Sequence, residues 1–133
     1  MRRVLLVEDS ASMRAFVRAA LTSSGKLGPL EIVEAQSGFD ALRLLPRGAW
    51  DLVITDINMP DINGLELISF IKKSESHKAT PILIISTASS ERDRERGLQL
   101  GASGYLVKPF TANVLEEHAL AQMGAAPSSG AHA

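Results

Sequence analysis

Five short runs of branched apolar residues recur along the chain, and segments with a helical spacing of apolar positions separate them. Such short runs are typical of strands buried on both faces of a sheet. The second run alternates its apolar residues with Glu31 and Glu34, as a strand nearer an edge does. The predicted strands are Val4–Val7, Leu30–Ala35, Leu52–Ile54, Ile82–Ile85 and Tyr105–Val107.

The segments between these strands show the i, i+3, i+4 pattern of amphipathic helices. Ser10 or Ser12 is expected to cap the first helix and Thr111 the last. The second helix is predicted over Ser37–Leu45, and the fourth includes Glu91–Arg96, whose charges favour a solvated face. Core-facing side chains are predicted at Met13, Phe16, Val17, Ala20, Leu21, Phe39, Leu42, Leu45, Leu65, Ile68, Ile71, Leu98, Leu100, Val114, Leu115 and Met123.

Strand and helix alternate five times along the chain. This order predicts an α/β fold with a doubly wound parallel sheet, covered by helices on both faces. Residues 1–123 are expected to form one domain, and residues 124–133, which lack bulky apolar side chains, a flexible C-terminal tail. No glycine-rich phosphate loop follows a strand, which disfavours the nucleotide-binding versions of this architecture.

Composition narrows the class of protein further. The chain has 133 residues, enough for one domain with a sizeable core, and a net charge of −1. This charge gives no bulk attraction to nucleic acid or to an anionic membrane, so neither is expected as a partner. Cysteine is absent, which is compatible with a reducing compartment, and the first apolar run is too short for a signal peptide or a membrane span. We therefore expect a cytoplasmic protein.

Polar side chains follow four of the five predicted strands. They are Glu8 and Asp9 after the first, Asp56 after the third, Ser86 and Thr87 after the fourth, and Lys108 after the fifth. The carboxyl ends of parallel strands meet at one edge of a sheet, so these side chains are expected to converge. Three carboxylates in one crevice repel one another, and a bound cation relieves the repulsion. Oxygen ligands without histidine or cysteine suit Mg²⁺.

Asp56 is interpreted as a nucleophile that accepts a phosphoryl group. A carboxylate that attacks phosphorus needs the surrounding negative charge neutralised, and Mg²⁺ and Lys108 would do this from two sides. Ser86 would donate a hydrogen bond to a phosphoryl oxygen. Each residue by itself has an ordinary alternative: Glu8-Asp9 as a helix cap, Asp56 as a turn residue, Lys108 as a surface lysine. Their agreement at matching strand ends favours the functional interpretation.

Four segments resemble the receiver domain of two-component response regulators: VLLVEDS, VITDINMPDINGLEL, PILIIST and YLVKPF. The resemblance runs from about Val4 to Met123. It implies a flavodoxin-like sheet with strand order 2-1-3-4-5 and five helices. It also implies that Asp56 is the phosphoacceptor, that Asp9 and Asp56 bind Mg²⁺, with Mn²⁺ as an alternative, and that Glu8 acts through water. Asn58 would give its backbone carbonyl to the metal.

The same resemblance assigns the remaining roles. Ser86 would be the switch hydroxyl and Tyr105 the switch aromatic, Lys108 would contact the phosphoryl group, and the Lys108–Pro109 peptide bond is expected to be cis. The implied partners are a sensor histidine kinase or histidine phosphotransfer protein and a downstream effector that binds the face of the fourth helix, fifth strand and last helix. Thr87 departs from the family, which usually has alanine there; its side chain could restrict access to the phosphoryl group or offer a second hydroxyl.

Two other functions remain as alternatives. An aspartate-nucleophile phosphohydrolase also uses a strand-end aspartate with Mg²⁺, but such enzymes typically carry a second acid where this chain has Asn58. A scaffolding receiver that is never phosphorylated is the other alternative, and the intact set of site residues argues against it. His77, His118 and His132 are expected to be ordinary surface residues.

Overall fold

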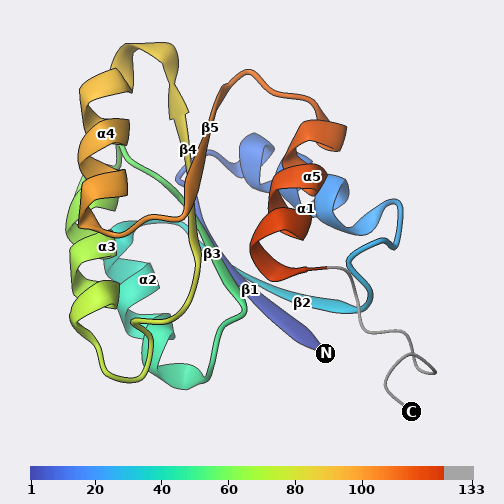
Figure 1. The fold of residues 1–133 in the computed structure, drawn as a ribbon, viewed down its shortest axis with the longest axis horizontal. Coiled ribbons are helices and arrows are strands. Elements are labelled where there is room, and N and C mark those ends of the chain that lie inside the picture. Colours follow the sequence, from blue (N-terminus) through green and yellow to red (C-terminus); the bar gives the residue numbers. More distant parts are fainter. Residues whose placement is uncertain (125–133) are drawn as a thin grey trace.

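The structure, a computed structural model, describes residues 1–124, in which five strands alternate with five helices (Figure 1). The strands are β1 (Arg2–Val7), β2 (Leu30–Ala35), β3 (Leu52–Asp56), β4 (Ile82–Thr87) and β5 (Gly104–Lys108). The helices are α1 (Ala11–Thr22), α2 (Gly38–Leu44), α3 (Gly64–Lys73), α4 (Glu91–Leu100) and α5 (Ala112–Met123), with short 3₁₀ turns η1 (Leu45–Arg47) and η2 (Ala88–Ser90). Apart from Gly124, the predicted tail lies outside the described residues.

All five strands are parallel and follow the order β2-β1-β3-β4-β5, which confirms the predicted α/β, flavodoxin-like fold. The register pairs Val7 of β1 with Thr55 of β3, and Asp56 with Ile85 of β4. Glu8, which follows Val7, and Ser86, which follows Ile85, therefore lie on either side of Asp56.

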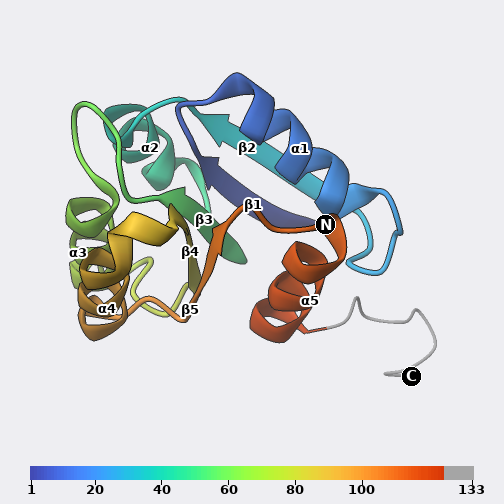
Figure 2. The ribbon, with the colours of Figure 1, turned by 90° about the horizontal axis from the view of Figure 1, so that it is seen from above.

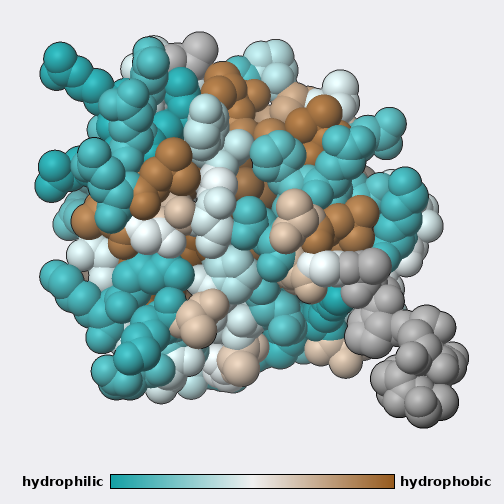
Figure 3. All heavy atoms as spheres, in the orientation of Figure 1, coloured by the Kyte–Doolittle hydropathy of each residue, from teal (hydrophilic) through white to brown (hydrophobic). Residues whose placement is uncertain are grey.

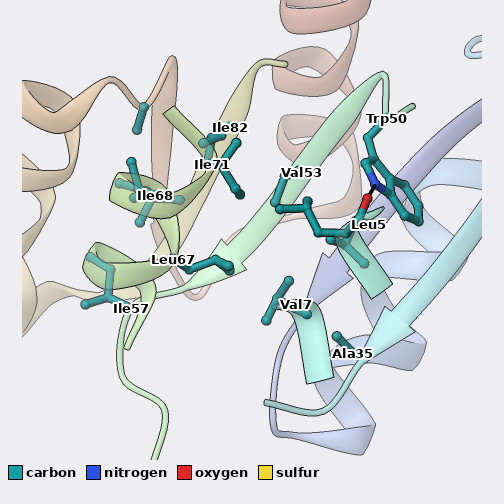
Figure 4. Close-up of a cluster of buried hydrophobic side chains, with 14 of the residues drawn as sticks. Leu5, Val7, Ala35, Trp50, Val53, Ile57, Leu67, Ile68, Ile71 and Ile82 are labelled. Atoms are coloured by element: carbon teal, nitrogen blue, oxygen red, sulfur yellow. Dashed lines mark hydrogen bonds between the residues drawn. The ribbon is translucent and has the colours of Figure 1, made fainter. Parts of the chain in front are cut away.

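Helices cover both faces of the sheet (Figure 2). Because successive strand residues point to opposite faces, Leu5 and Val7 belong to one hydrophobic cluster and Val4 and Leu6 to another. The first cluster, shown in Figure 4, packs under α2, α3 and α4; in it, the Trp50 indole N–H donates to the Leu45 carbonyl at 3.0 Å. The second packs under α1 and α5. No helix within residues 1–124 is long and apolar enough to cross a membrane.

Side-chain caps fix where four of the helices begin. Ser10, Ser37, Asn63 and Thr111 each accept a hydrogen bond from a backbone N–H in the first turn of the following helix. At α3 the Glu66 side chain also reaches back to the Asn63 backbone N–H, which completes a capping box. Of the two serines considered for α1, Ser10 is the cap.

Some predicted core positions are wrong. Phe39 is 67% exposed, and Phe16, Leu98 and Val114 are also exposed. Gly38, one residue before Phe39, packs against the Ile62 backbone, so the next helical position turns away from the sheet. In α3 Leu67 is fully buried, whereas Leu65 is only partly so. Each of these side chains lies one or two helical positions from a buried residue, and a step of one position turns a side chain by about 100° around the helix.

The prediction that His77 is a surface residue is also wrong. His77 is only 7% exposed, and its Nδ1 has no hydrogen-bond partner among the described residues. Its backbone lies in a tight turn after α3, in which the His77 and Lys78 N–H groups both donate to the Ser74 carbonyl. This turn folds the imidazole back onto the protein. His118 is partly exposed, and His132 lies outside the described residues.

Candidate functional site

Glu8, Asp9 and Asp56 come together at the carboxyl edge of the sheet. One carboxylate oxygen from each lies within 4.8 Å of the others. Glu8 and Asp56 are buried and Asp9 is exposed, so the cluster opens to solvent on the Asp9 side. The structure thus brings together the three acids that the sequence placed after β1 and β3.

The Asp56 carboxylate is held by three donors. Its Oδ1 accepts from the backbone N–H groups of Ile57 at 2.7 Å and Asn58 at 3.2 Å, and its Oδ2 accepts from the Lys108 Nζ at 3.0 Å. The start of α3 closes the back of this loop, since the Gly64 N–H donates to the Ile57 carbonyl at 2.8 Å. A Cβ at Gly64 would overlap the Asp56 carbonyl and lie 2.8 Å from the Ile57 Cα, so this close approach requires glycine.

Lys108 bridges two acids. Its Nζ also donates to Glu8 Oε1 at 2.8 Å, while Glu8 Oε2 accepts from the Ser10 backbone N–H at 3.0 Å. Burial raises the pKa of the Glu8 carboxyl, and its hydrogen bonds with Lys108 and Ser10 offset this in part. Burial by itself would lower the pKa of Lys108, but the hydrogen bonds and charges of Glu8 and Asp56 outweigh it and raise that pKa. A charged ammonium group therefore faces the carboxylate of Asp56.

Ser86 and Thr87 end β4 with opposite environments. Ser86 is fully buried, and within the described part of the chain its hydroxyl has no hydrogen-bond partner. A buried hydroxyl without a partner costs about 1–3 kcal/mol, so this group is poised to bind an added acceptor. Thr87 is exposed, and its hydroxyl lies 2.9 Å from that of Ser89 and 3.3 Å from that of Ser90.

Tyr105 in β5 is 42% exposed, and its ring lies beside α4. The Arg94 guanidinium is centred 5.4 Å from the ring centroid, and it also donates to the Thr87 carbonyl at 2.7 Å. At the end of β5 the Lys108–Pro109 peptide bond is cis. Figure 3 shows this side of the molecule, where hydrophilic side chains line the edge over α4 and hydrophobic ones lie between them in separate spots.

The donor set fits a hard divalent cation. Its ligating atoms are carboxylate oxygens, Asp9 is accessible from solvent, and neither histidine nor cysteine belongs to the cluster. Mg²⁺ takes such oxygen ligands and retains several water molecules, which the open side allows. The backbone carbonyl of Asn58 remains a predicted ligand. The role of Glu8, contact with the metal through a water molecule, also remains a prediction.

The sequence interpretation missed two residues at this site, Ser90 and Arg94. Ser90 accepts a hydrogen bond from the Asn58 carboxamide at 3.1 Å, and Arg94 connects Thr87 to Tyr105. Both lie in a polar segment whose composition is typical of a solvated helix face, and nothing in their sequence spacing distinguishes them from their neighbours. Only the path of the β4–α4 connection brings them to the site.

Comparison with known proteins agrees with this geometry. The family model for the response regulator receiver domain matches residues 4–120. The chain belongs to this family. It is 34% identical over 130 residues to a chemotaxis protein CheY homolog of Campylobacter jejuni, covering 97% of this chain and 98% of the relative.

Solved receiver structures have the same fold. The chemotaxis response regulator CheY4 of Vibrio cholerae superposes with a TM-score of 0.82 at 34% identity, covering 92% of this chain and 98% of that one. The receiver domain of the sensor histidine kinase PA1611 from Pseudomonas aeruginosa has a TM-score of 0.81 at 28% identity, with 92% and 98% covered. That structure contains a magnesium ion coordinated in its active-site cleft. Receiver domains are signalling modules rather than classical enzymes, so this chain is a signalling module of the CheY-like kind.

Proposed function

We propose that this receiver domain accepts a phosphoryl group on Asp56 from the phosphohistidine of a sensor histidine kinase or a histidine phosphotransfer protein. One observation carries the proposal: the Asp56 carboxylate faces the Lys108 ammonium at 3.0 Å, in a cluster of three acids. Ser86, one residue beyond the β4 partner of Asp56, supplies a buried hydroxyl that has no partner among residues 1–124.

The transfer is a substitution at phosphorus. An Asp56 carboxylate oxygen forms the new P–O bond while the P–N bond to the donor imidazole breaks, and the imidazole leaves with the bonding electron pair and takes up a proton from solvent. Lys108 balances the negative charge beside the reacting oxygen, and Ser86 donates a hydrogen bond to the bound phosphoryl group. Hydrolysis of the resulting acyl phosphate by water would return the domain to its starting state.

The residues that would hold Mg²⁺, or Mn²⁺, are Asp9, Asp56 and the Asn58 backbone carbonyl, with Glu8 acting through water. When bound, the ion supplies positive charge that offsets the charges of the carboxylates and the phosphoryl group. The all-oxygen donor set supports this assignment.

The proposed output is a change on the α4–β5–α5 face in the cytoplasm. Phosphorylation would draw Ser86 toward the phosphoryl group and free the space behind it, and Tyr105 would rotate inward. Its partly exposed ring, held beside Arg94, supports Tyr105 as the side chain that changes position. A downstream effector protein that binds this face would then distinguish the two states.

Intact-mass measurement after incubation with a small phosphodonor and Mg²⁺ tests the function. We expect one phosphoryl adduct on the wild type and on Asp93→Asn, a control on α4, and none on Asp56→Asn. Continuous consumption of the donor without an adduct would instead identify a phosphohydrolase. No reaction in the wild type would identify a scaffolding receiver, and either result contradicts the proposal.

A further inference from the structure

We infer that Ser90 is a positioning residue that ties the loop after β3 to the loop after β4, so that the metal-binding and phosphoryl-binding sides of the site are mechanically connected. This inference rests on the proposed function. Ser90 is only 6% exposed although its neighbours are polar. Its hydroxyl accepts from the Asn58 Nδ2 at 3.1 Å and lies 3.3 Å from the Thr87 hydroxyl.

On the β3 side, these contacts hold Asn58 at two points. Its backbone N–H donates to Asp56 Oδ1 at 3.2 Å, and its carboxamide donates to Ser90. Asn58 is otherwise exposed, so without Ser90 its side chain would rotate in solvent. The first bond holds the peptide plane that precedes Asn58 and the second holds its side chain, so together they restrain the backbone torsions of Asn58 that orient its carbonyl, the proposed metal ligand.

On the β4 side, Ser90 contacts the residue that follows the proposed phosphoryl-binding hydroxyl. Thr87 comes directly after Ser86 and pairs in register with Lys108 of β5. Its hydroxyl lies within hydrogen-bond distance of the Ser89 and Ser90 hydroxyls, and its carbonyl accepts a hydrogen bond from Arg94. The Thr87 hydroxyl thus contacts the loop in this structure, and both roles considered for it, restriction of access to the phosphoryl group or a second hydroxyl beside it, stay predictions.

Ser86 and Asn58 are therefore linked through Thr87 and Ser90. A shift of Ser86 toward the phosphoryl group moves Thr87, and the hydroxyl contacts carry this displacement to Asn58. In the other direction, a ligand that fixes the Asn58 carbonyl restrains the end of η2, where Ser90 lies. Two sites that bias one shared element are coupled, and the coupling is reciprocal.

Ser90→Ala tests the link with Ser89→Ala as the matched control, since Ser89 also contacts Thr87 but is exposed and, in the described part of the chain, has no hydrogen bond with Asn58. The probe is Mg²⁺ alone, titrated calorimetrically into unphosphorylated protein. We expect Ser90→Ala to weaken Mg²⁺ binding roughly tenfold, the scale for loss of a residue that orients a metal ligand, and Ser89→Ala to bind as the wild type does. Equal affinities of the two variants would overturn the inference, as would a wild type that does not bind Mg²⁺.

A second pair of variants at Ser90 separates the effect of the hydroxyl from the effect of side-chain size. Ser90→Thr and Ser90→Val have nearly the same volume, so any packing cost is shared between them. The NMR signals of the Asn58 carboxamide protons report the bond directly, without metal or phosphoryl group. We expect slow exchange with solvent in the wild type and Ser90→Thr, and fast exchange in Ser90→Val. The same exchange rate in all three proteins would overturn the inference, whereas failure of Asp56 phosphorylation alone would contradict only the proposed function.

Discussion

Gly64 shows how a single missing side chain positions the nucleophile. The first turn of α3 lies against the end of β3 so closely that a Cβ at residue 64 would overlap backbone atoms of Asp56 and Ile57. Gly97 in α4 also lacks room, but there the obstacle is the flexible end of the Ile84 side chain. A side chain can move to relieve an overlap at small cost, whereas the backbone at the end of a central strand cannot.

Gly64→Ala is therefore expected to lower the free energy of unfolding by about 1–3 kcal/mol, the usual cost of overpacking. Gly97→Ala should change it by less, because the higher helix propensity of alanine offsets part of the strain. Urea unfolding of both variants and the wild type measures the difference. A Gly97→Ala protein less stable than Gly64→Ala would contradict the role given to Gly64.

At the scale of the element, charge as well as burial holds β2 and α1 together. Glu34 of β2 accepts from the Arg14 Nε at 3.0 Å and from the Arg18 Nε at 2.8 Å, both from α1. The hydrogen bond with Arg18, opposed by burial and supported by the charges of both arginines, lowers the pKa of the Glu34 carboxyl. The folded protein therefore favours the ionised form more than the unfolded chain does.

A lowered pKa gives stability that is present above the ordinary value of 4.5 and is lost as pH falls through the lowered value. Wild type is expected to exceed Glu34→Gln by about 0.5–1 kcal/mol at neutral pH, and this difference should shrink below about pH 4.5. Urea unfolding at a series of pH values measures it. Glu31→Gln, which removes a half-exposed partner of Arg3, is the control and should have a smaller effect. A difference that grows in acid would show that the sign is wrong.

Element type and order could be predicted from the sequence, because apolar runs and helical spacing repeat without ambiguity. The convergence of Glu8, Asp9, Asp56 and Lys108 also followed, since a parallel sheet brings its strand ends to one edge. The errors have local causes. Burial of His77 depends on a turn held by backbone hydrogen bonds, and Ser90 reaches Asn58 only through the path of η2. Neither contact leaves a pattern of residue spacing.

At the scale of the whole molecule, the sheet makes two hydrophobic clusters into one cooperative unit. Val53 and Ile54 are neighbours in β3, yet Val53 packs in the cluster of Trp50 and Ile54 in the cluster on the opposite face. Loss of packing on either face weakens the same five strands. Small single domains with a shared core usually unfold in one transition.

Ile54→Ala is accordingly expected to destabilise the protein by roughly 2–5 kcal/mol, the range for truncation of a buried isoleucine. Trp50 is the only tryptophan in the chain, so its fluorescence reports the face that does not contain Ile54. In Ile54→Ala, the unfolding midpoint measured by Trp50 fluorescence should fall by the same amount as the midpoint measured by far-UV circular dichroism. A fluorescence midpoint that stays at the wild-type value while the dichroism midpoint falls would show that the faces unfold separately.

The position of β2 at the margin of the sheet bears on behaviour in concentrated solution. An outermost strand offers unpaired backbone groups to a neighbouring molecule, and continued addition of strands in this way leads to aggregates. Here that strand carries Glu31 and Glu34, whose arginine partners come from the same molecule. A second copy that docked its own β2 alongside would bring like charges opposite one another, which opposes the pairing. The glutamates that help to hold β2 in its own fold thus also disfavour edge-to-edge pairing with neighbouring copies.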